Sequence, residues 1–439
     1  RHTSWCTVTG VQTCALPIAA AALAGRHAWR QRRAFLAAQG RAREVQGRLL
    51  RELLEAHRDT AFGREHDFAR IRTRDDFVRA VPIRSYEALR PYVDRVLAGE
   101  TTALLPPGEP VLMFARTSGT TGEPKHVPVT RRFLADARRG WNVFGVSVLR
   151  DHPDGWLRPI LQITSPMDEA RSPTGLPCGA ISGLLAATQK RIVRRMYVVP
   201  PAVTAIRDPD ARCYTLLRCA VERDVGLITT ANPSSTIRLI ETGRQHLDRL
   251  LRDLTDGTLR PPGEGVSAER LGLRLRANRA LAGRIAAAVR RDGELLPRHF
   301  WNVAFLTNWT GGTLKLYLPR LRRLFGGVPI RDIGLLASEG RLSLPLEDET
   351  AAGAAEITSN VLEFIPADDY GRADPPALLV EQVEVGQEYF VVLSNWAGLW
   401  RYSLDDRVRV TGRVGEGAVL EFLARGLHTA NITGEKITE

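Results

Sequence analysis

Apolar residues recur at helical spacing from about Ala28 to Arg58, and this pattern predicts one amphipathic helix. The apolar positions are Leu36, Val45, Leu49, Leu50, Leu53 and Leu54. Residues 59–100 then alternate short apolar runs with polar turns, which indicates a series of short helices. The amino-terminal part of the chain is therefore expected to be helical.

Two short apolar runs flank a polar stretch, "RTSGTTGEPKHVPVT", at residues 116–130. "VLMFART" at residues 111–117 predicts a strand that enters this stretch, and "HVPVT" at residues 126–130 predicts a strand that leaves it. Thr130 is a candidate N-cap for a helix that begins near Arg131.

Strand and helix patterns alternate through the rest of the chain. Strands are predicted at residues 159–166, 225–233 and 301–309, and helices at 234–254 and 267–292. The carboxyl-terminal third is richer in strands, which are predicted at residues 360–366, 377–383, 387–395, 399–404, 407–414 and 418–424. Residues 254–267 and 345–356 are expected to be surface loops. This order predicts an α/β protein with more than one sheet.

Composition and charge narrow the classes of function. The 439 residues suffice for one large domain or two to three ordinary ones. The net charge is +12, but the arginines are scattered and no nucleic-acid-binding motif is present, so we expect no nucleic-acid partner. Because no apolar run approaches the length of a membrane span, we expect no membrane partner either.

The two ends of the chain look artificial, because it begins without a methionine and stops at "NITGEKITE" with no sign of a finished element. "VTGVQTCALPI", residues 8–18, resembles a translated sequencing adapter, so we treat residues 1–18 as a probable non-native segment and not as a secretory signal. The remaining cysteines, Cys178, Cys213 and Cys219, have no metal-ligand spacing, which is typical of a reducing compartment. We therefore expect a cytoplasmic protein.

The polar stretch at residues 116–130 is a candidate anion-binding loop. It is not a Walker-type phosphate loop, because Gly119 and Gly122 are too close together and Lys125 is followed by His126. Glycine-rich backbone amides, hydroxyls and a lysine can nonetheless form a concave site for phosphate. An ordinary Ser/Thr/Gly turn is the alternative for this composition alone.

Lysine is rare in this chain, which gives Lys125 more weight. Of 61 basic residues only four are lysines: Lys125, Lys190, Lys315 and Lys436. A lysine retained among so many arginines can mark a position that needs a compact, flexible ammonium group. Chance placement of two of the four in motifs is the alternative.

"TSGTTGEPK" resembles the phosphate loop of the acyl-adenylate-forming superfamily. Six further segments are similar, in the same order, to the acyl acid–amido synthetases of the auxin-responsive promoter family. They are "DTAFGREHDF", "DDFVRAVPIRSYEALRPYVDRVLAGE", "IRDIGLLASEG", "SNVLEFIP", "NWAGLWRYSLDD" and "TGEKITE". The resemblance runs from about residue 40 to the end. It implies a large adenylation domain of stacked sheets flanked by helices at residues 19–425. Residues 426–439 would then be the hinge and the start of a truncated small C-terminal α/β domain.

The family's reaction implies ATP and Mg²⁺ as cofactors, and a small carboxylic acid and an amine, typically an amino acid, as substrates. The acid is adenylated with release of pyrophosphate, and the amine then captures the acyl group as an amide. The family's phosphate loop matches Thr117, Ser118, Gly119, Thr120, Thr121, Gly122 and Lys125. Its second motif, beside adenine and the α-phosphate, matches Ala337, Ser338 and Glu339, and Glu339 is the candidate Mg²⁺ ligand.

The family's third motif matches "RYSLDD", in which Asp406 would hold the ribose hydroxyls. Ser403 stands where arginine is usual and Asp405 where glycine is usual, so Asp405 could compete with Asp406 or alter the backbone at that turn. Arg425 and Lys436 match the hinge region, where Lys436 would reach the adenylate phosphate.

Two other functions stay open at this point. An acyl–coenzyme A ligase shares the loop and the adenylate but transfers the acyl group to a thiol. A non-catalytic basic nucleic-acid-binding protein is supported by the +12 charge alone. The sequence also leaves open which acid and amine are used, whether the truncated chain is active, and the oligomeric state.

Overall fold

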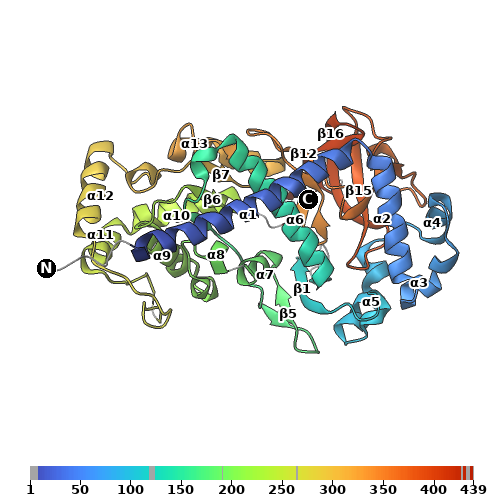
Figure 1. The fold of residues 1–439 in the computed structure, drawn as a ribbon, viewed down its shortest axis with the longest axis horizontal. Helices are drawn as coiled ribbons and strands as arrows, with labels where there is room; N and C mark the ends of the chain where they lie inside the picture. Colours follow the sequence, from blue (N-terminus) through green and yellow to red (C-terminus); the bar gives the residue numbers. More distant parts are fainter. Residues whose placement is uncertain are drawn as a thin grey trace.

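The computed structural model describes residues 8–117, 124–189, 191–263, 265–426, 429–431 and 436–438. The molecule is elongated, with a large antiparallel sheet in one half and a helix-covered parallel sheet in the other (Figure 1). Helix α1 (Val8–Gln39) runs along both halves and packs on α6 (Arg131–Asp151). The predicted α/β class with more than one sheet is confirmed.

The antiparallel sheet forms the larger hydrophobic core. Its strand order is β11-β12-β17-β16-β15-β13-β14, and β18 and β19 extend β17. The bounds are β11 (Ser343–Leu344), β12 (Ala352–Ala355), β13 (Asn360–Pro366), β14 (Leu378–Leu379), β15 (Glu388–Asn395), β16 (Tyr402–Val414), β17 (Gly417–Arg425), β18 (Thr429–Asn431) and β19 (Lys436–Thr438). Helix α2 (Ala42–His57) packs its apolar side on β13, and this burial accounts for the leucine pattern of the sequence.

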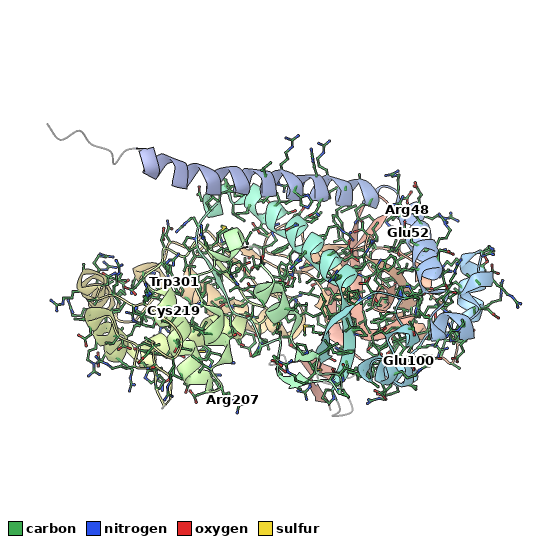
Figure 2. All side chains as sticks on the ribbon, turned by 60° about the horizontal axis from the view of Figure 1, so that its bottom comes forward. Arg48, Glu52, Glu100, Arg207, Cys219 and Trp301 are labelled. Atoms are coloured by element: carbon green, nitrogen blue, oxygen red, sulfur yellow. The ribbon has the colours of Figure 1, made fainter. Side chains whose placement is uncertain are left out.

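The parallel sheet has the order β3-β6-β7-β8 and lies in a second core. Its strands are β3 (Ile160–Gln162), β6 (Leu227–Thr229), β7 (Phe305–Thr307) and β8 (Ile330–Arg331). The helices around it are α8 (Arg191–Arg194), α9 (Pro209–Ala220), α10 (Pro233–Gln245), α11 (Leu247–Asp256), α12 (Arg279–Asp292) and α13 (Leu318–Phe325). Figure 2 shows Trp301 and Cys219 in this half, far from Arg48 and Glu52 on α2.

A third sheet, of order β2-β1-β5-β4, carries the polar loop. Its strands are β1 (Val111–Thr117), β2 (Lys125–Thr130), β4 (Ala170–Arg171) and β5 (Pro177–Gly179). The Thr130 side chain accepts a hydrogen bond from the backbone N–H of Phe133, 3.1 Å away, so the predicted N-cap of α6 is confirmed. A separate hairpin joins β9 (Leu336–Ala337) to β10 (Gly340–Arg341).

The expected short helices at residues 59–100 are confirmed as α3 (Ala61–Glu65), α4 (Arg74–Ala80) and α5 (Tyr86–Leu97). Helix α7 (Ile181–Ala187) follows β5. The prediction of one continuous helix from Ala28 to Arg58 is wrong, because the chain breaks at Gly40 and Arg41 into α1 and α2. The β16–β17 turn fills the break, and the backbone N–H of Glu416 donates to the last carbonyl of α1, that of Gln39 (2.9 Å).

Four further boundaries differ from the predictions. Residues 267–278 are not helical, and Gly272 within them has φ +63°, which a helix cannot accommodate. The strands predicted at 399–404 and 407–414 form the single strand β16, while only Leu378–Leu379 of the run at 377–383 pairs as a strand. The loop predicted at 345–356 contains β12.

No helix in the described part of the chain combines the length and apolar character that crossing a membrane requires.

Candidate functional site

The polar loop joins two antiparallel strands, as predicted. Thr117 ends β1 and lies opposite Lys125, the first residue of β2. The Thr117 hydroxyl oxygen is buried and has no hydrogen-bond partner among the described residues. Ser118, Gly119, Thr120, Thr121 and Gly122 lie outside the described residues. The loop therefore begins at a hydroxyl without a partner and ends at an ammonium group, and both can bind an anion.

Lys125 is buried between two aromatic rings, and the residue is only 5% exposed. Its ammonium nitrogen lies 5.5 Å from the ring centroid of Tyr86 and 5.9 Å from that of Tyr402, within reach of cation–π attraction. It also donates a hydrogen bond of 3.4 Å to the Tyr402 hydroxyl. Burial, followed by the nearby Arg425 guanidinium, lowers the pKa of Lys125 below its ordinary value.

Glu339 lies at the tip of the β9–β10 hairpin, directly after Ala337 and Ser338, and is 2% exposed. The Tyr402 hydroxyl donates to its carboxylate at 3.3 Å, and the side-chain amide of Asn395 donates to its backbone carbonyl at 2.7 Å. Burial, and next the Glu339 charge, raise the pKa of Tyr402 above its ordinary value. The structure thus joins the predicted loop and the predicted second motif through one tyrosine.

Asp406 and Arg425 face each other on the neighbouring strands β16 and β17. The Nε atom of Arg425 lies 3.9 Å from a carboxylate oxygen of Asp406, an ion pair too long for a hydrogen bond. Burial opposes the charged form of Arg425, but the charges of Asp406 and Glu339 outweigh it and raise the pKa of the guanidinium. Asp406 is 5% exposed and the side chain of Arg425 is 18% exposed, so water reaches this charge pair mainly from the arginine.

Asp405 takes the backbone conformation of a glycine. Its φ is +60°, in the left-handed region that side chains with a Cβ rarely adopt. Its carbonyl accepts from the N–H of Gly426 at 2.7 Å, and its carboxylate accepts from the Tyr370 hydroxyl and, at 3.4 Å, from the Ser403 hydroxyl. Desolvation and the bond to Asp405 raise the pKa of Tyr370. Asp405 is thus held by local partners and keeps the turn that a glycine would make.

Lys436 begins β19, which pairs with β18, and β18 in turn pairs with β17 at Arg425. The backbone of Lys436 therefore belongs to the sheet that carries Arg425 and Asp406. Its side chain lies outside the described residues. Lys315, the other described lysine, forms an exposed ion pair of 2.8 Å with Glu421, as expected of a surface lysine.

Tyr86 is a site residue that the sequence analysis did not identify. Arg84 pairs with β16, because its N–H donates to the Arg401 carbonyl (2.9 Å) and its carbonyl accepts from the Ser403 N–H (2.8 Å). Two residues later, the Tyr86 hydroxyl accepts from the N–H of His126 at 2.8 Å and donates to its carbonyl at 3.2 Å. These contacts tie the start of α5 to the residue after Lys125.

A second missed feature supports the Glu339 hairpin. Asp332, after β8, accepts from the N–H and hydroxyl of Thr310 (2.6 and 2.8 Å) and from the N–H of Gly334 (2.6 Å). The indole of Trp309 donates to the Gly334 carbonyl at 2.8 Å. Burial raises the pKa of Asp332 to about 6 despite these donors. The sequence does carry a signal for this feature. "AFLTNWT" and "PIRD" each pass from apolar to polar residues, and polar residues at the ends of parallel strands meet at one edge of the sheet.

The site therefore brings Lys125 and Glu339 together on Tyr402, and Arg425, which pairs with Asp406, lies within electrostatic reach of Tyr402 and Glu339. Such an arrangement can neutralise phosphate oxygens with cations and accept hydroxyl hydrogen bonds on carboxylates. Within the described residues, no three His, Cys, Asp or Glu side chains cluster as metal ligands.

The fold is that of an acyl acid amido synthetase. The structure of the GH3.15 acyl acid amido synthetase superposes with a TM-score of 0.77 over 91% of this chain and 71% of that chain, at 20% identity. A second structure, the AtGH3.15 enzyme in complex with 2,4-DB, gives the same TM-score over 94% and 73% at 19% identity. The predicted large domain of several sheets flanked by helices is thereby confirmed.

The GH3 family N-terminal domain matches residues 31–330, and the GH3 family central domain matches residues 356–425. The chain belongs to the GH3 family, the family of acyl acid–amido synthetases that its motifs indicate. A jasmonoyl–L-amino acid synthetase of Nicotiana attenuata is 25% identical over 421 residues, 91% of this chain and 72% of the relative. An indole-3-acetic acid-amido synthetase of Arabidopsis thaliana is 23% identical over 415 residues, 90% of this chain and 69% of the relative.

Proposed function

We propose that this protein activates a carboxylic acid with ATP and transfers the acyl group to the amine of an amino acid. In the first step a carboxylate oxygen attacks the α-phosphorus, and pyrophosphate leaves as the acyl adenylate forms. In the second step the amine attacks the acyl carbon, AMP leaves, and the amine loses a proton as the amide forms. The observation that carries this proposal is the convergence of Lys125 and Glu339 on Tyr402, beside the Asp406–Arg425 ion pair, in a chain whose relatives are amino-acid-conjugating ligases.

Lys125 and the loop from Thr117 to Gly122 would bind the β- and γ-phosphates. A buried ammonium stabilises the charge that develops on pyrophosphate more strongly than a solvated one, because water does not screen it. The lowered pKa of Lys125 reflects burial without phosphate nearby, and a bound polyanion would favour the charged form. Lys125 thus acts electrostatically and moves no proton.

Glu339 fits a Mg²⁺ site in its chemistry, since a carboxylate is the oxygen ligand that this hard cation prefers. With Glu339 as the one protein carboxylate at the hairpin tip, phosphate oxygens and water would complete the coordination, as is usual for Mg²⁺ with nucleotides. When bound, the ion would neutralise phosphate charge. Ala337 and Ser338 would line the adenine and α-phosphate side of the site.

Asp406 would accept hydrogen bonds from the ribose hydroxyls, and Arg425 would hold its carboxylate charged and oriented. Lys436 would reach the adenylate phosphate from β19. Asp405 suits the ribose role less well, because one oxygen of its carboxylate, Oδ1, already accepts from Tyr370 and Ser403. The substrates themselves would be a small carboxylic acid and an amino acid, in the cytoplasm.

Carboxylate-dependent exchange of pyrophosphate into ATP tests the first step. We expect exchange with some acids of a mixed panel that includes jasmonate and indole-3-acetate, and its loss in Lys125→Ala. A folded protein that binds no ATP would overturn the proposal. Product analysis with amino acids or coenzyme A then decides between the amide-forming reaction and the acyl–coenzyme A ligase. Salt-dependent nucleic-acid binding without ATP affinity would favour the basic binding protein instead.

A further inference from the structure

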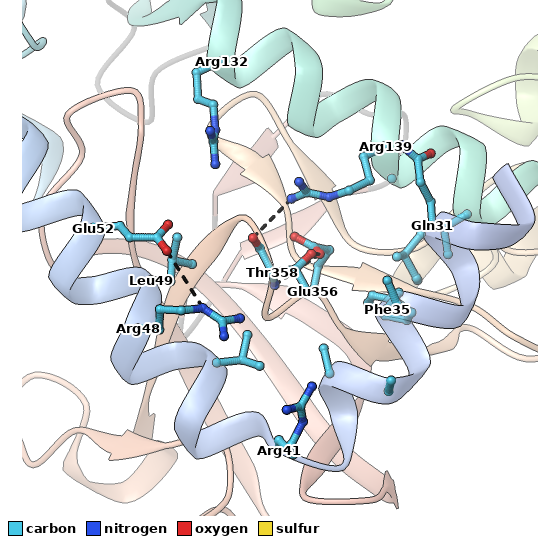
Figure 3. Close-up of a pocket in the computed structure, with 17 residues that line it drawn as sticks. Gln31, Phe35, Arg41, Arg48, Leu49, Glu52, Arg132, Arg139, Glu356 and Thr358 are labelled. Carbon is cyan, nitrogen blue, oxygen red and sulfur yellow. Dashed lines mark hydrogen bonds and ion pairs between the residues drawn. The ribbon is translucent and has the colours of Figure 1, made fainter. Parts of the chain in front are cut away.

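A pocket of about 410 Å³ lies between α1, α2, α6 and the turn at residues 356–359. None of the residues that surround Lys125 lines it. Four arginines do so, namely Arg41, Arg48, Arg132 and Arg139. Figure 3 shows their guanidinium groups directed into the pocket from α2 on one side and α6 on the other. Its volume is within the range of small-molecule sites, roughly 300–1,000 Å³.

Arg41, directly before α2, and Arg48, on α2, are only weakly neutralised by the protein. Arg41 lies 3.8 Å from Glu44, and Arg48 lies 3.7 Å from Glu44 and 3.9 Å from Glu52. These distances exceed a hydrogen bond, and such half-exposed helix pairs contribute little. Both guanidinium groups therefore have donors available for a ligand that enters the pocket.

The arginines on α6 are oriented by the protein. The Arg132 guanidinium stacks 4.6 Å from the ring centroid of Trp396, and Arg139 donates to the Thr358 carbonyl at 3.1 Å. Asp136 pairs with both, at 3.8 Å and 3.0 Å, from its place between them on the helix. Each of these guanidinium groups keeps some N–H donors available for a ligand, and the contacts with the protein fix the direction of those donors.

Two carboxylates, those of Glu52 and Glu356, also line the pocket and would repel an anionic ligand. Glu356 is saturated, because its oxygens accept from the backbone N–H and hydroxyl groups of both Thr358 and Ser359. Burial raises its pKa, although Arg139 and these donors oppose the shift. Glu52 faces Arg48. Among the residues that line the pocket, arginines therefore outnumber carboxylates; Glu44 and Asp136, which form ion pairs with these arginines, do not line it.

Apart from Gln31 and Thr358, the rest of the lining is apolar, with Phe35, Leu49 and Val143 among the walls. A bare inorganic ion would leave this surface wet, whereas a carbon skeleton would cover it. We propose that the pocket binds an organic polyanion, a small molecule with two or more carboxylate or phosphate groups, at a site separate from the nucleotide site. The guanidinium forks of α2 and α6 bind its charged groups from opposite sides.

Citrate is a suitable probe, measured by isothermal titration calorimetry on the full chain at low salt. We expect one citrate per chain, and an affinity at least tenfold weaker in Arg41→Gln/Arg48→Gln. Arg284→Gln/Arg290→Gln, which removes two exposed arginines of the distant helix α12, is the matched control and is expected to bind like the wild type. Lys125→Ala should also bind citrate normally.

Three outcomes would overturn the proposal. Equal weakening in both double variants would mean that citrate responds only to net charge. Loss of binding in Lys125→Ala would place citrate in the nucleotide site. No heat of binding to the wild type at millimolar citrate would mean that the pocket takes no such ligand. If the α2 double variant unfolds, Arg132→Gln provides the same comparison from α6, with citrate affinity again expected to fall severalfold.

Discussion

The ammonium nitrogen of Lys125 lies 3.4 Å from the hydroxyl oxygen of Tyr402, which donates its own hydrogen to Glu339 at 3.3 Å. One hydroxyl thus accepts from the lysine and donates to the carboxylate, so it links two buried opposite charges. Lys125 and Tyr402 are 277 residues apart in the sequence, and this contact connects the polar loop to the antiparallel sheet. Tyr402 is therefore a positioning residue in the proposed reaction.

Tyr402→Phe keeps the ring and removes that link. Hydrogen bonds to charged groups contribute about 1.5–3 kcal/mol, so we expect the pyrophosphate exchange rate to fall about tenfold or more. Tyr389→Phe is the matched control, because Tyr389 is also buried in this sheet and its hydroxyl accepts one hydrogen bond, from the N–H of Glu384. A folded Tyr402→Phe with wild-type exchange would show that the link has no part in catalysis.

Tyr86 offers Lys125 an aromatic face, and two substitutions separate this effect from its hydrogen bonds. Tyr86→Phe keeps the ring, whereas Tyr86→Leu removes a cation–π contact of about 0.5–2 kcal/mol. The charged lysine is needed for exchange, so activity should fall as pH rises through its lowered pKa. Without the ring the charged form is less favoured, and the alkaline limb should move to lower pH in Tyr86→Leu than in Tyr86→Phe. Coincident alkaline limbs in the two variants would refute this role.

The strands of the carboxyl-terminal third were predictable because their apolar runs are long and buried. β13 begins and ends where its pattern does, at Asn360 and Pro366. β16 was predicted as two strands because Asp405 and Asp406 interrupt its apolar pattern, although Asp405 carries the strand onward at positive φ. The break between α1 and α2 was not predictable, because it depends on a turn near Gly415 that packs on Gly40.

The candidate site was predictable only where a residue lies in a recognisable motif. Lys125, Glu339 and Asp406 were found in this way; the structure joins Lys125 and Glu339 through Tyr402 and pairs Asp406 with Arg425. Tyr86 was not, since its contact with His126 spans 40 residues and its own segment carries no chemical motif. Long-range contacts of this kind depend on how sheets and helices pack, which periodicity does not encode.

Two adjacent carboxylates allow a direct test of the ribose site. Asp406→Ala should weaken ATP binding roughly ten- to hundredfold, because charge-assisted bonds to hydroxyls contribute about 1.5–3 kcal/mol. Asp405→Ala should leave ATP affinity within about threefold, since the Asp405 carboxylate binds Tyr370 and Ser403. Equilibrium titration of ATP on both variants checks this, and the reverse order would assign the ribose to Asp405.

His57 should make the stability of the fold depend on pH. It is fully buried, its Nδ1 is 2.8 Å from the Leu53 carbonyl, and its ring lies 5.8 Å from Trp396 and 5.1 Å from Trp400. Burial lowers its pKa to about 4, although the Leu53 carbonyl opposes the shift. Between pH 6.5 and pH 4 the unfolded chain therefore binds a proton that the folded chain does not. The stability that a neutral His57 contributes is present above pH 6.5 and is lost as pH falls toward 4.

His57→Phe keeps a ring in this position and removes the titration. From pH 7.5 to pH 4.5 the free energy of unfolding should fall by about 2.5 kcal/mol more in the wild type than in the variant. Urea unfolding at the two pH values measures this change in each protein. Subtracting the change in the variant from that in the wild type cancels the contributions of the titrating groups that the two proteins share. Equal losses of unfolding free energy in the two proteins would contradict the prediction. They would mean that His57 is already protonated in the folded protein, or that acid opens the cluster of Trp396 and Trp400 before the histidine titrates.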